Sequence, residues 1–427
     1  MMKNRKKRKV TSTASSPLPT TIDSLPDDVV ADILLRLPSA AAICRAVFAS
    51  EHWIRVATSS TFLRRLRDIH DYPLLLGHFV APYGHRFFTP AHFYPAPLRS
   101  SESDGVLAAM VRRGDFFLTR IQVQGSGQHV LEDCRGGLLL FSDTRTLRVF
   151  DPVTHRVSIV DQLRRHGGRA ADHRGRTLCL LPNGDDAGAF RVMSLQHGNG
   201  KKLARLEVYN SCTRAWRVLS GAGTDKIPAR SHMAQIYRGH YSPAMHAGDR
   251  IYWKYSVADS LLSLDTKTMT FSDVRLPPGV TRRSAYAVGE TEDGTCCLVH
   301  VVKHRRQMQV WRFKLGDDDH KGNGAQMWEL ERQVPLILDS VSVYRSVDQV
   351  RAIVGGIVLL CVDNSSSYQH HIAFRLKSLK VEADFTCRGL ARPFVIEWRI
   401  KLLNLQWEPL EIMRILLAHV GPFVLST

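Results

Sequence analysis

The hydrophobic positions divide the chain into a short helical part and a long part made of short strands. Near the N-terminus, apolar residues recur at spacings of three and four, the period of one helical face: Val30, Ile33, Leu34 and Leu37. Ser24 and Pro26 precede this stripe and favour a helix start, because serine accepts backbone N–H bonds and proline already has a helical φ. Pro38 cannot continue the hydrogen bonds of a helix. The pattern predicts a short helix that ends before Pro38.

Two more segments before residue 72 keep a helical period. Ser39 offers a second cap, and the period continues through Ile43 to Ile54; a third segment begins at Phe62. Three short amphipathic helices bury little surface alone, so such a unit is marginal unless a partner covers it. The pattern predicts a docking module over residues 22–71, and the alternative is a helical cap on a larger domain.

From residue 72 to about residue 400 the helical stripes give way to short β-rich runs between turn residues. The clearest runs are 137–141, 147–150, 206–209, 250–255 and 310–315. Within them one turn unit recurs, with an Asp or Asn after an apolar residue, a Thr three residues later and an apolar residue at plus six. The units begin at Asp151, Asn210 and Asp265. Each unit predicts a β-hairpin.

The spacing of these hairpins favours one kind of β domain. The units lie roughly 50 to 60 residues apart, the scale at which propeller blades of four strands repeat. A β-sandwich needs longer strands at tighter spacing. We therefore expect a small all-α module followed by a mainly-β domain, an irregular β-propeller of roughly six blades. Residues 401–427 become helical in pattern and are left unplaced.

Charge changes this interpretation mainly at the N-terminus. The formal net charge is +18 at pH 7, and basic residues gather before the folded part: Lys3, Arg5, Lys6, Lys7, Arg8 and Lys9. The run and the low-complexity residues after it predict a disordered tail over residues 1–21. Nuclear import and simple solubilisation both remain open for this run.

The sequence contains neither a membrane span nor a secretory signal, so we expect a protein that stays inside the cell. No apolar stretch reaches the roughly 18 residues of a membrane-spanning helix, and no secretory signal is present. The cysteines form no CxxC pair, which indicates buried thiols and not disulfides. We expect the nucleus, the cytoplasm or both, and no membrane partner.

The sequence offers little catalytic chemistry. Cys296, Cys297, His300 and His304 cluster, but adjacent cysteines on a strand point to opposite faces and do not close one metal site. No phosphate loop, dinucleotide fingerprint or nucleophile elbow is present. We therefore expect no catalytic residue, no metal and no cofactor.

The histidines and basic residues of the β domain are also explained without a binding or catalytic role. Five histidines fall at or near turns and are expected to be solvated loop residues: His155, His173, His197, His240 and His246. Residues 311–314 alternate aromatic and basic side chains, which could form a nucleic-acid stripe, but a period of two favours a half-buried strand.

The helical part resembles the F-box, in spacing that of the large plant families and especially the grass-type ones. The matching residues are Leu25-Pro26-Asp27-Asp28, Ile33-Leu34, Arg36-Leu37-Pro38, Ile43, Arg45, Trp53 and Phe62-Leu63-Arg64-Arg65. In that family the motif binds a Skp-type adaptor and, through it, a cullin. The resemblance implies these adaptor-facing residues: Leu25, Pro26, Ile33, Leu34, Leu37, Pro38 and Ile43. It also implies that Trp53 and Phe62 pack inside the module.

The β part resembles the F-box-associated domain of plant F-box proteins. The resemblance rests on residues 134–140, 149–154, 250–253, 264–266 and 288–294. It implies a non-catalytic receptor that binds an unknown substrate protein through the β domain, as the substrate-recognition subunit of a Skp-cullin-F-box ubiquitin ligase.

Two other classes of function remain open. One is a nucleic-acid or chromatin-associated propeller scaffold, which is less favoured and predicts steep salt dependence of binding after removal of residues 1–21. The other is a propeller enzyme or lectin with a site in the central channel.

Overall fold

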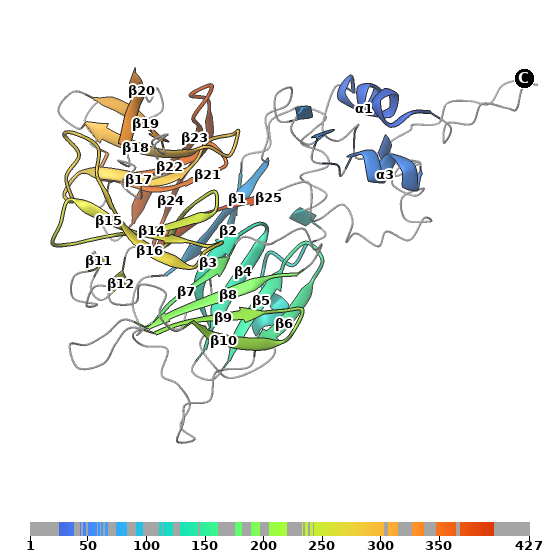
Figure 1. The fold of residues 1–427 in the computed structure, drawn as a ribbon, viewed down its shortest axis with the longest axis horizontal. Coiled ribbons are helices and arrows are strands. Elements are labelled where there is room, and N and C mark those ends of the chain that lie inside the picture. Colours follow the sequence, from blue (N-terminus) through green and yellow to red (C-terminus); the bar gives the residue numbers. More distant parts are fainter. Residues whose placement is uncertain are drawn as a thin grey trace, which may run out of the picture.

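A computed structural model of the chain forms a β-propeller with a small helical module beside it (Figure 1). The structure describes residues 25–37, 43, 46–47, 50–57, 59, 61–62, 65–66, 74–82, 91–96, 111–112, 114–122, 129–143, 146–160, 176–181, 189–196, 205–219, 233, 235–237, 240–241, 243–302, 306–314, 327–336, 347–363 and 368–396. The basic run at residues 3–9, Pro38 and residues 401–427 lie outside these ranges.

The described strands form six blades, of which five are antiparallel meanders of four consecutive strands. Blade 1 contains β3 (Val130–Arg135), β4 (Leu138–Ser142), β5 (Leu147–Asp151) and β6 (Arg156–Val160). Blade 2 contains β7 (Arg176–Leu181), β8 (Arg191–Gln196), β9 (Arg205–Asn210) and β10 (Ala215–Leu219). Blade 3 contains β13 (Met245–Ala247), β14 (Arg250–Lys254), β15 (Ser260–Asp265) and β16 (Thr270–Arg275).

The next two blades repeat this plan. Blade 4 contains β17 (Ala285–Glu290), β18 (Cys296–Val302), β19 (Gln307–Lys314) and β20 (Met327–Pro335). Blade 5 contains β21 (Gln349–Val354), β22 (Ile357–Asp363), β23 (Gln369–Arg375) and β24 (Val381–Cys387). A two-stranded sheet, β11 (Gln235–Tyr237) with β12 (His240–Tyr241), lies between blades 2 and 3 in the chain.

Blade 6 joins the two ends of the β domain and closes the ring. It orders β2 (His92–Pro95), β1 (Leu74–Ala81) and β25 (Leu390–Ile396) side by side. β25 pairs antiparallel with β1 and contacts β21 of blade 5 and β3 of blade 1. The first strand of each meander occupies the same inner position, because β3 contacts β7, β13 contacts β17, and β17 contacts β21. The expected irregular propeller is confirmed.

The recurring turn unit predicted from sequence is confirmed in blades 1, 2 and 3. The apolar residues that flank each turn pair across the hairpin: Phe150 with Val157, Tyr209 with Trp216, and Leu264 with Phe271. The Asp265 carboxylate accepts the N–H groups of Lys267 and Thr268, both at 3.0 Å, and Asp151 accepts the two corresponding N–H groups. Asn210 accepts the first of them, the Cys212 N–H, at 2.8 Å. In each unit the residue after the Thr has positive φ, and this conformation lets the second strand pair in register with the first.

The helical module contains α1 (Asp27–Leu35) and α3 (Glu51–Ala57), and a short helix α6 (Thr119–Gln122) precedes blade 1. Two details differ from the sequence prediction. Pro26 is the N-cap of α1 and makes no side-chain cap bond. α3 begins at Glu51, with the Ser50 hydroxyl accepting the Trp53 N–H, so the helical period expected from Ser39 to Ile54 is interrupted.

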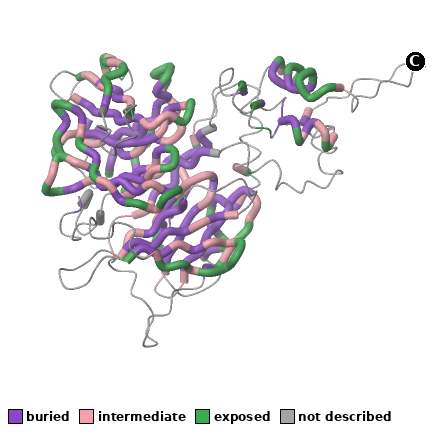
Figure 2. The backbone as a smooth tube through the Cα atoms, in the orientation of Figure 1, coloured by how far each residue is buried: buried purple, intermediate pink, exposed green. Residues whose placement is uncertain are grey.

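Buried residues follow the strands of the blades, while exposed residues gather at the outer turns (Figure 2). One apolar cluster runs continuously through blades 3, 4 and 5, whereas the helical module has a separate core of its own. None of the described helices is long and apolar enough to cross a membrane. The described cysteines are all free thiols.

Candidate functional site at the centre of the propeller

The inner strands of five blades surround a small cavity. Its lining comes from β3, β13, β17, β21 and β25, or from residues that adjoin them, and its volume is about 90 Å³. Pockets that bind drug-sized molecules have volumes of about 300–1,000 Å³. This cavity among the described residues has room for a few waters or one small ion.

Asp133 on β3 is the point where four blades meet. Its carboxylate accepts the Leu180 N–H of blade 2 at 2.8 Å, lies 3.3 Å from Nε2 of His246 in blade 3, and lies 3.8 Å from Nη1 of Arg392 in blade 6. Burial alone would raise the pKa of this carboxyl, but His246, Arg392 and the Leu180 N–H together lower it to about 2. Asp133 is therefore a fixed buried negative charge.

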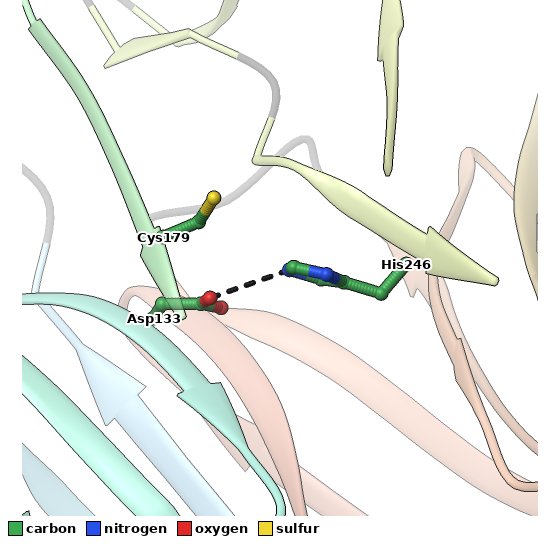
Figure 3. Close-up of side chains that lie close together, drawn as sticks. All are labelled: Asp133, Cys179 and His246. Atoms are coloured by element: carbon green, nitrogen blue, oxygen red, sulfur yellow. Dashed lines mark ion pairs between the residues drawn. The ribbon is translucent and has the colours of Figure 1, made fainter. Parts of the chain in front are cut away.

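Two more side chains lie beside Asp133. The Cys179 thiol on β7 and the His246 ring on β13 come together with the carboxylate, with all three potential ligand atoms within 4.8 Å of one another (Figure 3). Burial raises the pKa of the Cys179 thiol well above its ordinary value. Burial, with Arg135 adding to it, lowers the pKa of His246, and the opposing attraction of Asp133 is smaller.

A second ion pair crosses the centre of the ring. Arg135 at the end of β3 donates to the Glu290 carboxylate at the end of β17 at 3.2 Å, and the same carboxylate oxygen accepts the Gly248 N–H at 2.8 Å. Blades 1 and 4 stand on opposite sides of a six-bladed ring. This ion pair therefore links opposite blades, and both of its residues line the cavity.

This centre was not predicted from the sequence. The prediction that His246 is a solvated loop histidine is wrong, because its side chain is 11 % exposed and faces Asp133. The short strand β13 follows turn residues, so local sequence looked like a loop. Asp133 and Cys179 gave no motif, since they come together only when the ring closes. The predicted separation of Cys296 and Cys297 fits the structure, in which Cys297 is buried and Cys296 contacts the Tyr252 hydroxyl.

Residues 311–314 do not present the unpaired basic side chains that the nucleic-acid alternative requires. These residues lie on β19, as the period of two predicted, and Trp311 is buried. Arg312 pairs with Glu331 at 3.3 Å, and Lys314 pairs with Glu329. Both basic side chains are thus matched by carboxylates of β20.

The predicted adaptor-facing residues divide by exposure. Leu34 and Ile43 are 0 % and 1 % exposed and lie in the core of the helical module, together with the predicted packing residues Trp53 and Phe62. Leu25 and Leu37 are half-buried. The structure therefore corrects the placement of Leu34 and Ile43: they support the module from inside. Pro38 lies outside the described residues.

The outward face of α1 still carries apolar side chains. Ile33 is 37 % exposed, and Val29, which the sequence analysis did not select, is 39 % exposed one turn earlier; Pro26 is exposed as well. Of the predicted stripe, Val30 and Leu34 lie in the core and Leu37 packs against it, as expected, whereas the inward placement of Ile33 was wrong.

Ion pairs fix α1 on the rest of the module. Asp27 contacts His52 at 2.7 Å, and Asp32 contacts Arg65 at 2.6 Å. His52, which directly precedes Trp53, is the partner of Asp27. These contacts leave Val29 and Ile33 facing outward.

The propeller matches one protein family. Residues 130–338 match the family model described as "F-box protein AT5G49610-like, beta-propeller". This range begins at β3 and ends just after β20, so it spans blades 1 to 4. The match supports a β-propeller of the kind found in plant F-box proteins. No curated protein matches the chain significantly.

Several solved structures share a distant likeness. A protein from Lactobacillus plantarum is 10% identical, with 75% of this chain and 99% of that chain covered and a TM-score of 0.38. The Cps50 (Swd1) β-propeller domain of Myceliophteria thermophila is 13% identical, with 63% and 88% covered and a TM-score of 0.31. A luciferin-regenerating enzyme is 11% identical, with 62% and 76% covered and a TM-score of 0.31.

Proposed function

We propose that the protein is the substrate-recognition subunit of a Skp-cullin-F-box ubiquitin ligase and has no catalytic activity of its own. The family match of residues 130–338 supports an interaction role for the propeller. The observation that favours the ligase role is the apolar outward face of α1, which we call the α1 face: Pro26, Val29 and Ile33.

The α1 face fits a docking role better than a purely structural one. The helical module already has a closed core of its own, so Val29 and Ile33 are not needed to complete it. Two large apolar side chains one turn apart present a short hydrophobic strip to a partner helix or groove. Because each side chain is less than 40 % exposed, burial of the remaining apolar area would stabilise a complex by about 0.6–1.2 kcal/mol each. We infer that this strip is where a Skp-type adaptor binds.

The propeller would then hold the substrate protein. The small central cavity leaves the outer surfaces of the blades for a protein partner. In such a receptor catalysis is proximity: the substrate lysine is kept near the ubiquitin carried by a partner, which raises its effective concentration. No reacting group of this chain is required. Both the nucleus and the cytoplasm would contain an adaptor and a cullin.

A charge-insertion experiment tests the adaptor surface. Val29→Lys with Ile33→Lys places two ammonium groups in a surface that binding would desolvate, and both positions are open enough to accept lysine without disturbing the core. Pull-down of a purified Skp-type adaptor by the full chain should fall at least tenfold. The matched control is Ile159→Lys with Val257→Lys, two exposed apolar positions of the propeller, which should leave adaptor capture unchanged.

The two variants separate the possible outcomes. Both should keep the helical and β circular dichroism of the wild type, because no altered side chain is buried. If the α1 variant captures the adaptor as well as the control does, the α1 face is not the docking surface and the ligase proposal loses its support. Leu34 is unsuitable for this test, since a charge at a fully buried position would unfold the module.

A further inference from the structure

We propose that Asp133, Cys179 and His246 form a zinc site at the centre of the propeller. The three residues come from the inner strands of blades 1, 2 and 3, and their potential ligand atoms lie within 4.8 Å of one another (Figure 3). This inference is independent of the ligase role, because it concerns the inside of the ring.

The donor set matches zinc. Protein zinc sites take cysteine sulfur at about 2.3 Å, histidine nitrogen at about 2.0–2.1 Å and carboxylate oxygen at about 2.0–2.2 Å in tetrahedral geometry. Ligand atoms at these distances lie roughly 3–4 Å apart around the metal, so small side-chain movements would close this site. A sulfur ligand disfavours magnesium and calcium, which prefer oxygen.

The state of the His246 ring is a separate observation that points to a ligand. Neither ring nitrogen makes a hydrogen bond to the described residues, although only 11 % of the side chain is exposed to solvent. Nε2 lies 3.3 Å from the Asp133 carboxylate. Buried polar groups normally have partners, and an unsatisfied one calls for an explanation such as an ion. Coordination to a metal would satisfy one of these nitrogens.

The carboxylate is already held in the way that metal ligands usually are. Backbone N–H groups of Cys134 and Leu180 donate to its two oxygens at 2.9 and 2.8 Å, which fixes its orientation. Arg392 approaches Oδ1, while His246 lies on the side of Oδ2. The metal would therefore sit on the Oδ2 side, away from the guanidinium.

Charge and space allow the fourth ligand. Asp133 and His246 line the cavity of about 90 Å³, which has room for one water on the metal. On binding, the Cys179 thiol loses its proton to solvent, and the thiolate and carboxylate together balance the charge of Zn²⁺. The nearby Arg135 is already matched by Glu290.

A metal at this position would fasten three blades to one another. A ligand that binds only the folded state stabilises it, by about 2.7 kcal/mol at a free concentration one hundred times its dissociation constant. The inferred role is structural, because the ligands belong to different blades and the cavity admits no large substrate. Zinc should therefore raise the midpoint of thermal unfolding of the full chain.

Cobalt substitution tests the site directly. The full-length chain is stripped with a chelator and titrated with Co²⁺, whose thiolate complexes absorb in the near ultraviolet and whose tetrahedral complexes absorb in the visible. We expect one equivalent of Co²⁺ with both bands, and competition by Zn²⁺. Cys179→Ser and His246→Gln should lose the thiolate band or weaken binding at least tenfold. Cys212→Ser removes an exposed thiol and should bind as the wild type does.

The wild-type titration decides the question even if a variant fails to fold. Absence of a thiolate band in the wild type at millimolar Co²⁺, with no change in its thermal midpoint on addition of Zn²⁺, overturns the proposal. A folded Cys179→Ser variant that keeps the wild-type spectrum overturns it as well, since the sulfur ligand would then be another cysteine.

Discussion

His78 on β1 and His371 on β23 are fully buried where blade 6 meets blade 5, and both rings pack against Phe385 with ring centroids 4.7 and 5.4 Å away. Burial lowers the pKa of each to about 3, and Arg351 adds to the effect at His371. Neither strand was among those predicted from the sequence, and nothing local indicated that both rings would be kept neutral. That property depends on a contact between strands almost three hundred residues apart along the chain.

These two histidines predict how stability depends on pH. The unfolded chain binds protons at each histidine below about pH 6.5, whereas the folded chain does not until about pH 3. The free energy of unfolding should therefore fall as pH drops from 6.5 towards 3, by up to about 1.4 kcal/mol per pH unit for each group. Chemical denaturation between pH 7 and pH 5 measures this slope.

A substitution isolates the contribution of one histidine. His78→Leu removes one titrating group, so the slope between pH 6.5 and pH 5 should become shallower by up to about 1.4 kcal/mol per unit, whatever the change in stability at neutral pH. His92→Gln alters an exposed histidine on the neighbouring strand β2 and is the matched control, measured in the same way. Equal slopes in wild type and His78→Leu would show that His78 can be protonated without unfolding.

At the scale of elements, the hairpins were predictable because their signals are local. Asp151, Asn210 and Asp265 each begin a turn within a few residues, and the flanking apolar residues pair as the spacing required. Helix α1 was harder, because Ile33 and Leu34 are both apolar and neighbouring, and only the packing of α3 decides which of them faces inward. The local sequence pattern did not predict the contacts between blades.

Gly289 on β17 makes one of these contacts between blades. A methyl group there would collide with the backbone carbonyl and the Cβ of Ile353 on β21, so the inner strands of blades 4 and 5 approach closely only because this residue is glycine. Gly289→Ala should lower the free energy of unfolding by about 1–3 kcal/mol, the usual cost of overpacking. Urea denaturation monitored by tryptophan fluorescence measures it.

A second glycine provides the control for this element. Gly279 has a φ of +79° and open space around the position of a side chain, and asparagine tolerates this backbone region. Gly279→Asn should change the free energy of unfolding much less than Gly289→Ala does. Equal effects would mean that backbone freedom, and not the approach of blades 4 and 5, sets the cost at Gly289.

At the scale of the whole molecule, the sequence predicted a β domain of about the right number of blades but not how the ring closes. The closing pair joins β1 to β25, with Leu74 opposite Ile396. Pairing between distant segments has no short-range signature, and the same holds for the meeting of Asp133, Cys179 and His246. The helical module and the propeller, by contrast, have separate apolar cores, which the change of period near residue 72 anticipated.

This organisation predicts two cooperative units. Phe394 on β25 is fully buried and packs against Phe79, Phe93 and Phe116, with ring centroids 5.3, 6.4 and 5.6 Å apart. Phe394→Ala should destabilise by about 3–5 kcal/mol, and because every blade depends on ring closure, the loss should spread around the ring. Hydrogen exchange of the full chain, read by mass spectrometry, should rise in peptides of all blades and stay unchanged in α3.

The converse substitution lies in the helical module. Phe62 is 2 % exposed in the core that also holds Trp53, so Phe62→Ala removes a comparable contact from the other unit. Exchange should then rise in α1 and α3 and remain at wild-type levels in the blades, because the two cores share no residue. A rise confined to blade 6 in Phe394→Ala would instead mean that blades open one at a time, and that the cross-channel contacts of Asp133 and Glu290 hold the rest of the ring without its closing strand.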